Sequence, residues 1–257
     1  MIERIVRRRS LPEAYHDALT VLFSTGEKVA CPDWNTRQIE CSMTIEVVEP
    51  FAEPMISRCF VGGYRELEQY RQEMLDGILD FEVERGNWAY TYHDRMVNYH
   101  GINQVEFVID ELRRNPYSRR AVIVIRDVDV DAGNTDPACL QHIQYFVRDN
   151  KLHCKLMFRS NDACKATFMN AFAFIMLQKK IADELDYEVG TYTHRANSFH
   201  CYAQDYAMLE GYVRRYLSGE ETTYDYAGEW DELMEEAKPD IEEMVKELRS
   251  HGGNNNA

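Results

Sequence analysis

The sequence predicts an α+β fold: a single domain, residues 1–257, in which helices pack on a large mixed or antiparallel sheet. Segments with strand-like alternation and segments with helical spacing follow each other in mixed order, without a regular βαβ repeat. No internal repeat or low-complexity linker divides the chain, and its length suits one large domain. Apolar residues make up 45% of the sequence, which is enough for a substantial core.

The first half of the chain predicts helices and one long strand. Alternation of apolar and polar residues predicts the strand over 37–48. Apolar residues at helical spacing, each run followed by a Gly, Asp-Gly or Asn-Pro stop signal, predict three helices at 11–25, 64–75 and 104–113.

The second half predicts the main strands. A continuous apolar run predicts a buried strand over 121–125, and a polar loop follows over 127–137. Strands over 141–149 and 151–158 are joined by Asp149-Asn150, which suits a tight hairpin turn. The remaining predictions are a long apolar helix over 167–185, a strand over 187–196, a helix over 200–216, an acidic helix over 228–250 and a frayed tail over 251–257.

The acidic composition narrows the class of partner. The formal net charge is −15 and the isoelectric point is about 5.0. A nucleic-acid polymer requires a basic binding face, so we expect no nucleic acid as a partner. A few converging arginines nevertheless suffice to bind the single phosphate of a mononucleotide in an acidic protein.

Membrane, disulfide and metal chemistry are not expected. No run of 18 apolar residues predicts a membrane span, and the first residues lack the apolar segment of a signal peptide. Seven widely spaced cysteines without a Cys-x-x-Cys pair predict free thiols in a reducing cytoplasm, rather than a disulfide framework or a structural zinc site. The histidines lack ligand-like spacing to acidic residues, so we expect no metal site.

Cys139 is the first candidate for a reactive residue. It follows Asp136-Pro137 and so begins a strand, a position that leaves a thiol partly exposed, whereas most lone cysteines are buried structural residues. Arg159-Ser160 follows the next strand and offers donors that suit a phosphate, although a surface salt bridge would use the same residues. This pattern predicts a thiol beside an anion site, which suits attack on a phosphorylated, electron-poor ring.

Further polar residues lie in positions suited to nucleotide recognition. Asn170 interrupts an apolar helical run, where its amide either matches a pyrimidine edge or caps the helix. His200 and Tyr202 lie at a predicted strand-to-helix junction, which suits hydroxyl recognition or proton relay, or else His200 is a half-buried structural residue. Arg119 and Arg120 precede a buried strand, and both reach one ligand only where the chain is irregular.

In the order of these segments the chain resembles the thymidylate synthase family, including its pyrimidine hydroxymethylase branch. The resemblance extends from about residue 37 to residue 206 and is strongest from 115 onward. The segments that show it are Asn115-Pro-Tyr-Ser-Arg-Arg120, Pro137-Ala-Cys139, Arg159-Ser-Asn-Asp162, Asn170 and His200-Cys-Tyr202.

The resemblance implies the catalytic residues. Cys139 would be the nucleophile that adds to carbon 6 of the pyrimidine, with Tyr92 beside the thiol. Asp162 would lie near the folate and the pyrimidine. The family uses a glutamate as general acid/base, and we expect this role on Glu66, with Glu68 as the rival, because one helix face directs only one of them toward the site.

The resemblance also implies a thymidylate-synthase-like fold, an obligate homodimer and the substrate contacts. Arg159 and Ser160 would bind the 5′-phosphate, while Arg119 and Arg120 would reach the phosphate bound by the other subunit. The other implied contacts are Asn170 with the base edge, His200 and Tyr202 with the sugar 3′-hydroxyl, and Arg37 as a further phosphate ligand.

The implied reaction transfers one carbon from 5,10-methylenetetrahydrofolate to carbon 5 of a pyrimidine nucleoside 5′-monophosphate. Asn170 favours uracil, so dUMP is the expected substrate, with dCMP or CMP as alternatives. Hydride from the folate would give thymidylate, and water would give a 5-hydroxymethyl nucleotide.

The expected enzyme is a thymidylate synthase of archaeal type, and a dUMP or (d)CMP hydroxymethylase is the alternative, because four departures from the family bear on the outcome. The region between the helix at 64–75 and Tyr92 is shorter than in the bacterial enzymes. Phe158 and Leu140 stand where most synthases have Gln and His, and the chain ends without the small apolar residues that close the site in the synthases. A non-catalytic nucleotide-binding homologue, with Cys139 as a sensor thiol, is a third hypothesis.

Overall fold

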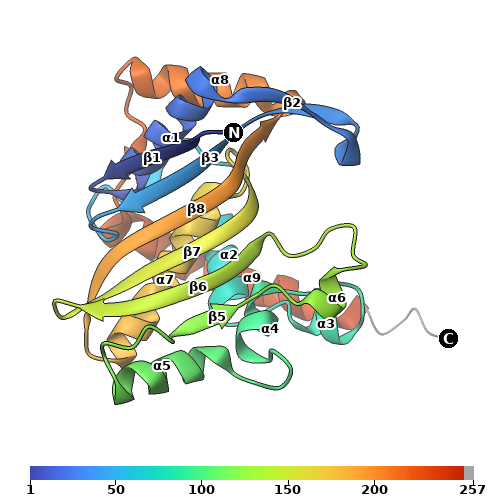
Figure 1. Ribbon diagram of the computed structural model, residues 1–257, viewed down its shortest axis with the longest axis vertical. Helices are drawn as coiled ribbons and strands as arrows, with labels where there is room; N and C mark the ends of the chain where they lie inside the picture. The colour runs from blue at the N-terminus through green and yellow to red at the C-terminus, as the bar shows by residue number, and fades with distance from the viewer. Residues whose placement is uncertain (252–257) are drawn as a thin grey trace.

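The computed structural model describes residues 1–251 (Figure 1). The strands are β1 (Glu3–Arg8), β2 (Glu27–Cys31), β3 (Thr36–Val47), β4 (Ile56–Ser57), β5 (Val122–Val124), β6 (Leu140–Arg148), β7 (Lys151–Asp162), β8 (Glu188–Tyr202) and β9 (Thr223–Tyr224). The α-helices are α1 (Leu11–Thr25), α2 (Tyr64–Leu75), α3 (Phe81–Glu84), α4 (Tyr92–Val97), α5 (Gln104–Arg114), α6 (Val128–Asp131), α7 (Thr167–Glu184), α8 (Tyr206–Leu217) and α9 (Asp231–His251).

Within residues 1–251, seven strands form one mixed sheet. Its order is β1-β3-β8-β7-β6-β5, and β2 pairs with β3 beside this path. The β1–β3 and β7–β8 pairs are parallel, and the other neighbouring pairs are antiparallel. The β6–β7 hairpin turns at Asp149 and Asn150, whose φ angles of 51° and 60° are those of a tight hairpin turn. The predicted α+β class and mixed sheet are confirmed.

Helices cover one face of this sheet. Figure 1 shows α2 and α7 behind β6, β7 and β8, with no helix drawn in front of these strands. The helix α7 is mostly buried, as its apolar sequence predicts. On the opposite face, the neighbouring side chains of Gln144, Lys155 and Arg195 are polar and at least partly exposed. The sheet therefore has one face in the core and one face open.

The strand β8 is longer than we predicted. It continues to Tyr202, and α8 begins only at Tyr206, so the helix predicted from residue 200 is wrong for its first residues. The register explains the difference, because His200 is aligned with Glu40 of β3 on one side and with Asp162 of β7 on the other. Pairing with two neighbouring strands outweighs the local helical pattern.

Several short elements were not predicted. The polar loop over 127–137 contains α6, whose first turn is capped by the Asp127 side chain, which accepts from the Asp129 amide at 3.1 Å. The strands β1 and β2 lie beside β3 and are largely exposed, so their sequences lack clear alternation of apolar and polar residues.

Two sequence expectations concern the chain as a whole. No helix within residues 1–251 is both long and apolar enough to cross a membrane. Apart from His251, the last residue of α9, the tail predicted over 251–257 lies outside the described residues.

Candidate active site

A cavity of about 430 Å³ opens where β6, β7 and β8 approach α7. Eight of the residues predicted for the site line it, and they come from separate parts of the chain: Tyr92, Cys139, Arg159, Ser160, Asp162, Asn170, His200 and Tyr202. Sequence reasoning missed the other lining residues, which are Trp34, Tyr70, Asp136, Asn161, Lys165, Ala166 and Met169. The fold thus gathers most of the predicted set around one cavity.

Cys139 lies immediately before β6 and is half-buried. Its carbonyl accepts a hydrogen bond from the Arg159 amide at 2.8 Å, which ties the two residues across the hairpin. The next amide, that of Leu140, donates to the Tyr92 hydroxyl oxygen at 3.3 Å. Burial raises the pKa of the Cys139 thiol above its ordinary value, the Arg159 cation partly opposes this, and the Asp136 carboxylate adds to it.

The Arg159 side chain lies against the segment that leads to Cys139. Its Nε donates to the Ala138 carbonyl at 3.2 Å, and its Nη2 donates to the Pro137 carbonyl at 2.5 Å. The Asp136 carboxylate is 3.9 Å from Nη2. Among residues 1–251, Nη1 has no hydrogen-bond partner, so this nitrogen remains available to an anion in the cavity.

His200 lines the cavity and has one buried, unpaired ring nitrogen. Its Nδ1 lies 3.3 Å from the Ser198 carbonyl and 3.4 Å from the Ser160 hydroxyl. Its Nε2 is buried and has no hydrogen-bond partner among the described residues. Burial lowers the pKa of His200, which favours the neutral ring. If Nδ1–H donates to the Ser198 carbonyl, Nε2 becomes an acceptor suited to a ligand hydroxyl.

Asn170 lies on the buried side of α7 and is 4% exposed. It does not cap the helix, because three residues of α7 precede it. Its Oδ1 accepts a hydrogen bond from the hydroxyl of Tyr70, a residue of α2 that also lines the cavity. Tyr70 lies one helical turn after Glu66, and this spacing is the sequence signal that could have identified it.

Asp162 and Lys165 shape the turn that enters α7. The Asp162 Oδ1 accepts from the amides of Cys164 and Lys165 at 2.9 and 2.8 Å. The Lys165 ammonium pairs with the Asp205 carboxylate at 2.6 Å, next to the cavity. These contacts hold Asp162 at the cavity wall through the backbone of the turn.

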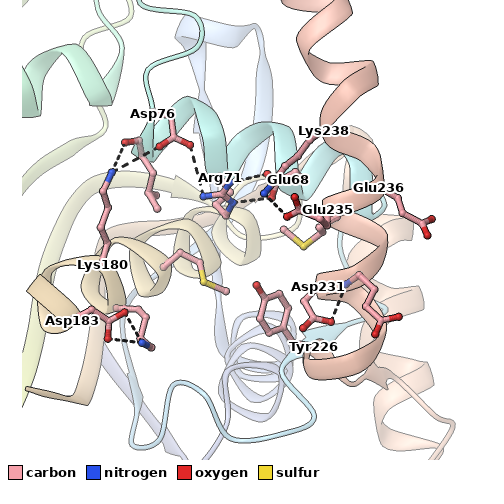
Figure 2. Close-up of a pocket in the computed structure, with 15 residues that line it drawn as sticks. Glu68, Arg71, Asp76, Lys180, Asp183, Tyr226, Asp231, Glu235, Glu236 and Lys238 are labelled. Carbon is pink, nitrogen blue, oxygen red and sulfur yellow. Dashed lines mark hydrogen bonds and ion pairs between the residues drawn. The ribbon is translucent and has the colours of Figure 1, made fainter.

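Neither predicted glutamate lines the cavity. Glu66 is exposed and accepts from the Gly63 amide at 2.8 Å, so it caps the start of α2. Glu68 is buried and accepts two 2.7 Å hydrogen bonds from Arg71. Figure 2 shows Glu68 turned toward Arg71 in a groove between α2, α7 and α9, which is a separate cavity. The expectation that α2 turns one of these carboxylates into the site is not supported, because the helix directs Tyr70 there.

Three predicted phosphate ligands lie away from the cavity of their own chain. Arg37 is exposed on β3. Arg119 and Arg120 are exposed in the irregular segment before β5, and the Arg120 Nε donates to Glu111 at 2.9 Å. The Gln144 side chain, on the open face of the sheet, donates to the Arg119 carbonyl at 2.9 Å. Arg119 therefore lies at the edge of the open face.

The described residues contain no group of three or more His, Cys, Asp or Glu side chains arranged to hold a metal. Two of the departures noted in the sequence, Phe158 and Leu140, are core residues. Phe158 is fully buried and stacks on His194 with ring centroids 4.7 Å apart, and Leu140 is also fully buried. Phe158 thus contributes to packing beneath the cavity rather than to its polar wall.

Comparison with known proteins gives a consistent result. A protein named "Putative thymidylate synthase" from Methanosarcina barkeri is 30% identical over 218 residues, which cover 83% of this chain and 96% of that protein. A protein of the same name from Methanocaldococcus jannaschii is 28% identical over 218 residues, covering 80% of this chain and 95% of the relative. The structure of thermostable thymidylate synthase A from Bacillus subtilis matches with a TM-score of 0.64 at 16% identity, covering 80% of this chain and 84% of that one, which shows a shared fold.

The model of the thymidylate synthase family matches residues 63–238, more than half of the chain. This range contains α2, the β6–β7 hairpin, α7 and all eight of the predicted residues that line the cavity. The chain therefore belongs to the thymidylate synthase family, whose members are methyltransferases.

Proposed function

We propose that this chain transfers one carbon from 5,10-methylenetetrahydrofolate to carbon 5 of dUMP and releases thymidylate. The observation that supports this most directly is the cavity itself, because its lining contains Cys139, Arg159 with a free guanidinium nitrogen and His200 with an unpaired imidazole nitrogen. A nucleophile, an anion ligand and a hydroxyl ligand within one 430 Å³ space suit a nucleoside monophosphate.

The polar groups suggest how the nucleotide binds. Arg159 Nη1 and the Ser160 hydroxyl would hold the 5′-phosphate, and the His200 Nε2 with the Tyr202 hydroxyl would hold the sugar 3′-hydroxyl. Asn170 would contact the edge of the base. The Ser160 hydroxyl and His200 Nδ1 are 3.4 Å apart, so the phosphate and the sugar would be held by neighbouring groups. Holding both would position the ring for attack by Cys139, and such positioning is a large part of catalysis.

In the first step, the Cys139 sulfur forms a bond to carbon 6 of the uracil. The electron pair of the carbon 5–carbon 6 double bond moves toward the carbonyl at carbon 4, so that carbon 5 becomes nucleophilic. Hydrogen-bond donors at the carbonyl stabilise the negative charge that develops there. Since burial raises the pKa of Cys139, the thiol is protonated before the reaction and passes its proton to water at this half-buried position as the sulfur adds, and the Arg159 cation favours that loss.

The folate would supply the one-carbon unit. Aromatic rings that suit stacking with a pterin line the walls, namely Trp34 at the cavity and Trp88 and Tyr90 in an adjoining cavity of about 180 Å³. Met169 adds an apolar side chain to the first cavity. Asp162, at the cavity wall, is the carboxylate that we expect to contact the folate or the pyrimidine.

We also propose that the active form is a homodimer in which arginines are shared. Arg119 and Arg120 are exposed and do not line the cavity of their own chain, and Arg119 lies at the edge of the open sheet face. A symmetric pairing of that face would bring each pair of arginines toward the partner's cavity. We place the enzyme in a reducing cytoplasm, which accords with seven free cysteines.

The test uses purified protein with methylenetetrahydrofolate and, in turn, dUMP, dCMP and CMP, followed by mass spectrometry of the products. We expect a methyl group on dUMP together with dihydrofolate. A 5-hydroxymethyl nucleotide without dihydrofolate would instead establish the hydroxymethylase reaction, and no product with any nucleotide would favour a non-catalytic homologue.

A trapping experiment tests the nucleophile separately. We expect 5-fluoro-dUMP and the folate to form a covalent complex with the wild-type chain. Cys139→Ala should bind the nucleotide but form no such complex, and Cys31→Ala, at the other half-buried cysteine, is the matched control. A covalent complex with Cys139→Ala would contradict the assignment.

A further inference from the structure

The side chains of Tyr70 and Asn170 meet at the wall of the candidate active site. Tyr70 belongs to α2 and Asn170 to α7, and both line the cavity that contains Cys139. The Tyr70 hydroxyl donates a hydrogen bond to Oδ1 of Asn170. The amino group of Asn170, Nδ2, has no partner among residues 1–251 and is not sealed from the cavity.

This contact determines which way the Asn170 amide faces. An amide can rotate by half a turn and exchange its oxygen and nitrogen. If it did so here, Nδ2 would face the phenol oxygen, and the Tyr70 proton would lose its acceptor within a buried site. A buried donor without an acceptor is costly, so the observed orientation is favoured. Burial also raises the pKa of Tyr70, so the phenol stays protonated and remains a donor at neutral pH.

The orientation has a consequence for the choice of base. With Oδ1 turned to Tyr70, the group that Asn170 presents to the cavity is a hydrogen-bond donor. At carbon 4, uracil has a carbonyl that accepts a hydrogen bond, whereas cytosine has an amino group that donates one. In this orientation, Nδ2 of Asn170 can donate to the uracil carbonyl. With cytosine it would face the amino group, which is also a donor, so no hydrogen bond would form.

We propose that Tyr70 is a specificity-determining positioning residue, which holds the Asn170 amide in the orientation that selects uracil over cytosine. This inference rests on the proposed nucleotide-binding function of the cavity. It adds a reason why the amide does not simply rotate to accept either base. It also assigns a role to the side chain that α2 directs into the site in place of a carboxylate.

The experiment measures dissociation constants of dUMP and dCMP for the full chain by calorimetry. In wild type we expect dUMP to bind more tightly. Tyr70→Phe removes the donor and lets the amide rotate, so the ratio of the dCMP to the dUMP dissociation constant should fall by about 5- to 100-fold, chiefly through tighter dCMP binding. Tyr216→Phe, which removes a tyrosine hydroxyl that donates to Asp17 away from this cavity, should leave the ratio unchanged.

Combining Tyr70→Phe with a substitution of Asn170 tests whether Tyr70 positions the amide or has only a structural role. Asn170→Asp replaces the amide by a carboxylate, which has two acceptors and no orientation to hold, so Tyr70→Phe should no longer change the ratio in that background. If Tyr70→Phe changes the ratio equally in both backgrounds, Tyr70 does not act through Asn170 and the inference is overturned. If Tyr70→Phe does not fold, Tyr70→Met also lacks the donor and carries the same expectation.

The outcomes distinguish the two proposals. Tight dUMP binding by wild type, with no change of ratio in Tyr70→Phe, overturns the role of Tyr70 and leaves the proposed function standing. No binding of either nucleotide by wild type overturns the proposed function and this inference with it. Both proposals are supported if Tyr70→Phe lowers the ratio of the dCMP to the dUMP dissociation constant in the wild-type background but not in the Asn170→Asp background.

Discussion

Replacing Arg159 by glutamine should weaken the binding of the nucleotide phosphate without weakening the binding of the rest of the nucleotide to the same degree. One guanidinium nitrogen, Nη1, is free for the phosphate, while Nε and Nη2 are held by the carbonyls of Ala138 and Pro137. Loss of one charge-assisted hydrogen bond costs roughly 1.5–3 kcal/mol. This corresponds to about 10- to 150-fold weaker binding of dUMP.

The assay compares dUMP with deoxyuridine, which lacks the phosphate. Binding of each to wild type and Arg159→Gln is measured by calorimetry or, for the weaker ligand, by NMR titration. We expect the large loss for dUMP and a change of less than about threefold for deoxyuridine, because only dUMP uses Nη1. Arg113→Gln is the matched control, since Arg113 is exposed on α5 and pairs with Glu184 instead.

Two results would refute this reasoning. Unchanged dUMP binding in Arg159→Gln would mean that the phosphate lies elsewhere. Equal losses for dUMP and deoxyuridine would mean that Arg159 acts only by holding the segment that leads to Cys139. Arg159→Lys keeps the charge but cannot hold both carbonyls and a phosphate at once. We therefore expect its loss of dUMP affinity to be smaller than that of Arg159→Gln.

Three further predictions concern the dimer, the thiol and acid stability. Mixed dimers of Cys139→Ala with an Arg119→Gln/Arg120→Gln double variant should regain about one quarter of wild-type activity, because half of the dimers contain one intact shared site; no recovery would place these arginines outside the partner's site. Alkylation of Cys139, followed by peptide mass spectrometry, should keep accelerating beyond the pH at which a free cysteine levels off, since burial raises its pKa; an earlier plateau would contradict this. Burial lowers the pKa of His16 from 6.5 to about 4, so its contribution to stability is complete above about pH 6.5 and is lost as pH falls toward 4. Denaturant unfolding should show a loss of about 2 kcal/mol from this residue at pH 5, and the loss should be smaller in His16→Gln; equal pH dependence in both would contradict it.

Much of the architecture could be predicted from local patterns. The apolar run of α7, the alternation in β6 and β7, and the Asp149-Asn150 turn each have a direct local cause, and these elements form where they were expected, except that β7 continues past residue 158 to Asp162. Residues 200–202 show the limit of this reasoning. Their local pattern suggested a helix, but β3 and β7 provide pairing partners on both sides, and that contact is invisible in the sequence.

The candidate site also contains residues that the local sequence predicts and residues that it does not. Cys139, Arg159 and His200 stand in recognisable local sequences, and strand register brings them to one cavity. The local sequence did not predict which side chain of α2 reaches the cavity. Glu66, Glu68 and Tyr70 lie within little more than one turn of one helix, and the sequence does not state how that helix is rotated against its neighbours.

The sequence by itself therefore determined the family resemblance, the order of the main elements and the identity of the nucleophile that we propose. Only the tertiary structure decided that Glu66 caps its helix, that Glu68 pairs with Arg71 and that Tyr70 reaches Asn170. The physical reason is that the facing of a helix is set by packing of α2 against α7 and α9 over long sequence separations. Local propensity favours a helix in this segment, but it does not specify which side of that helix meets the active site.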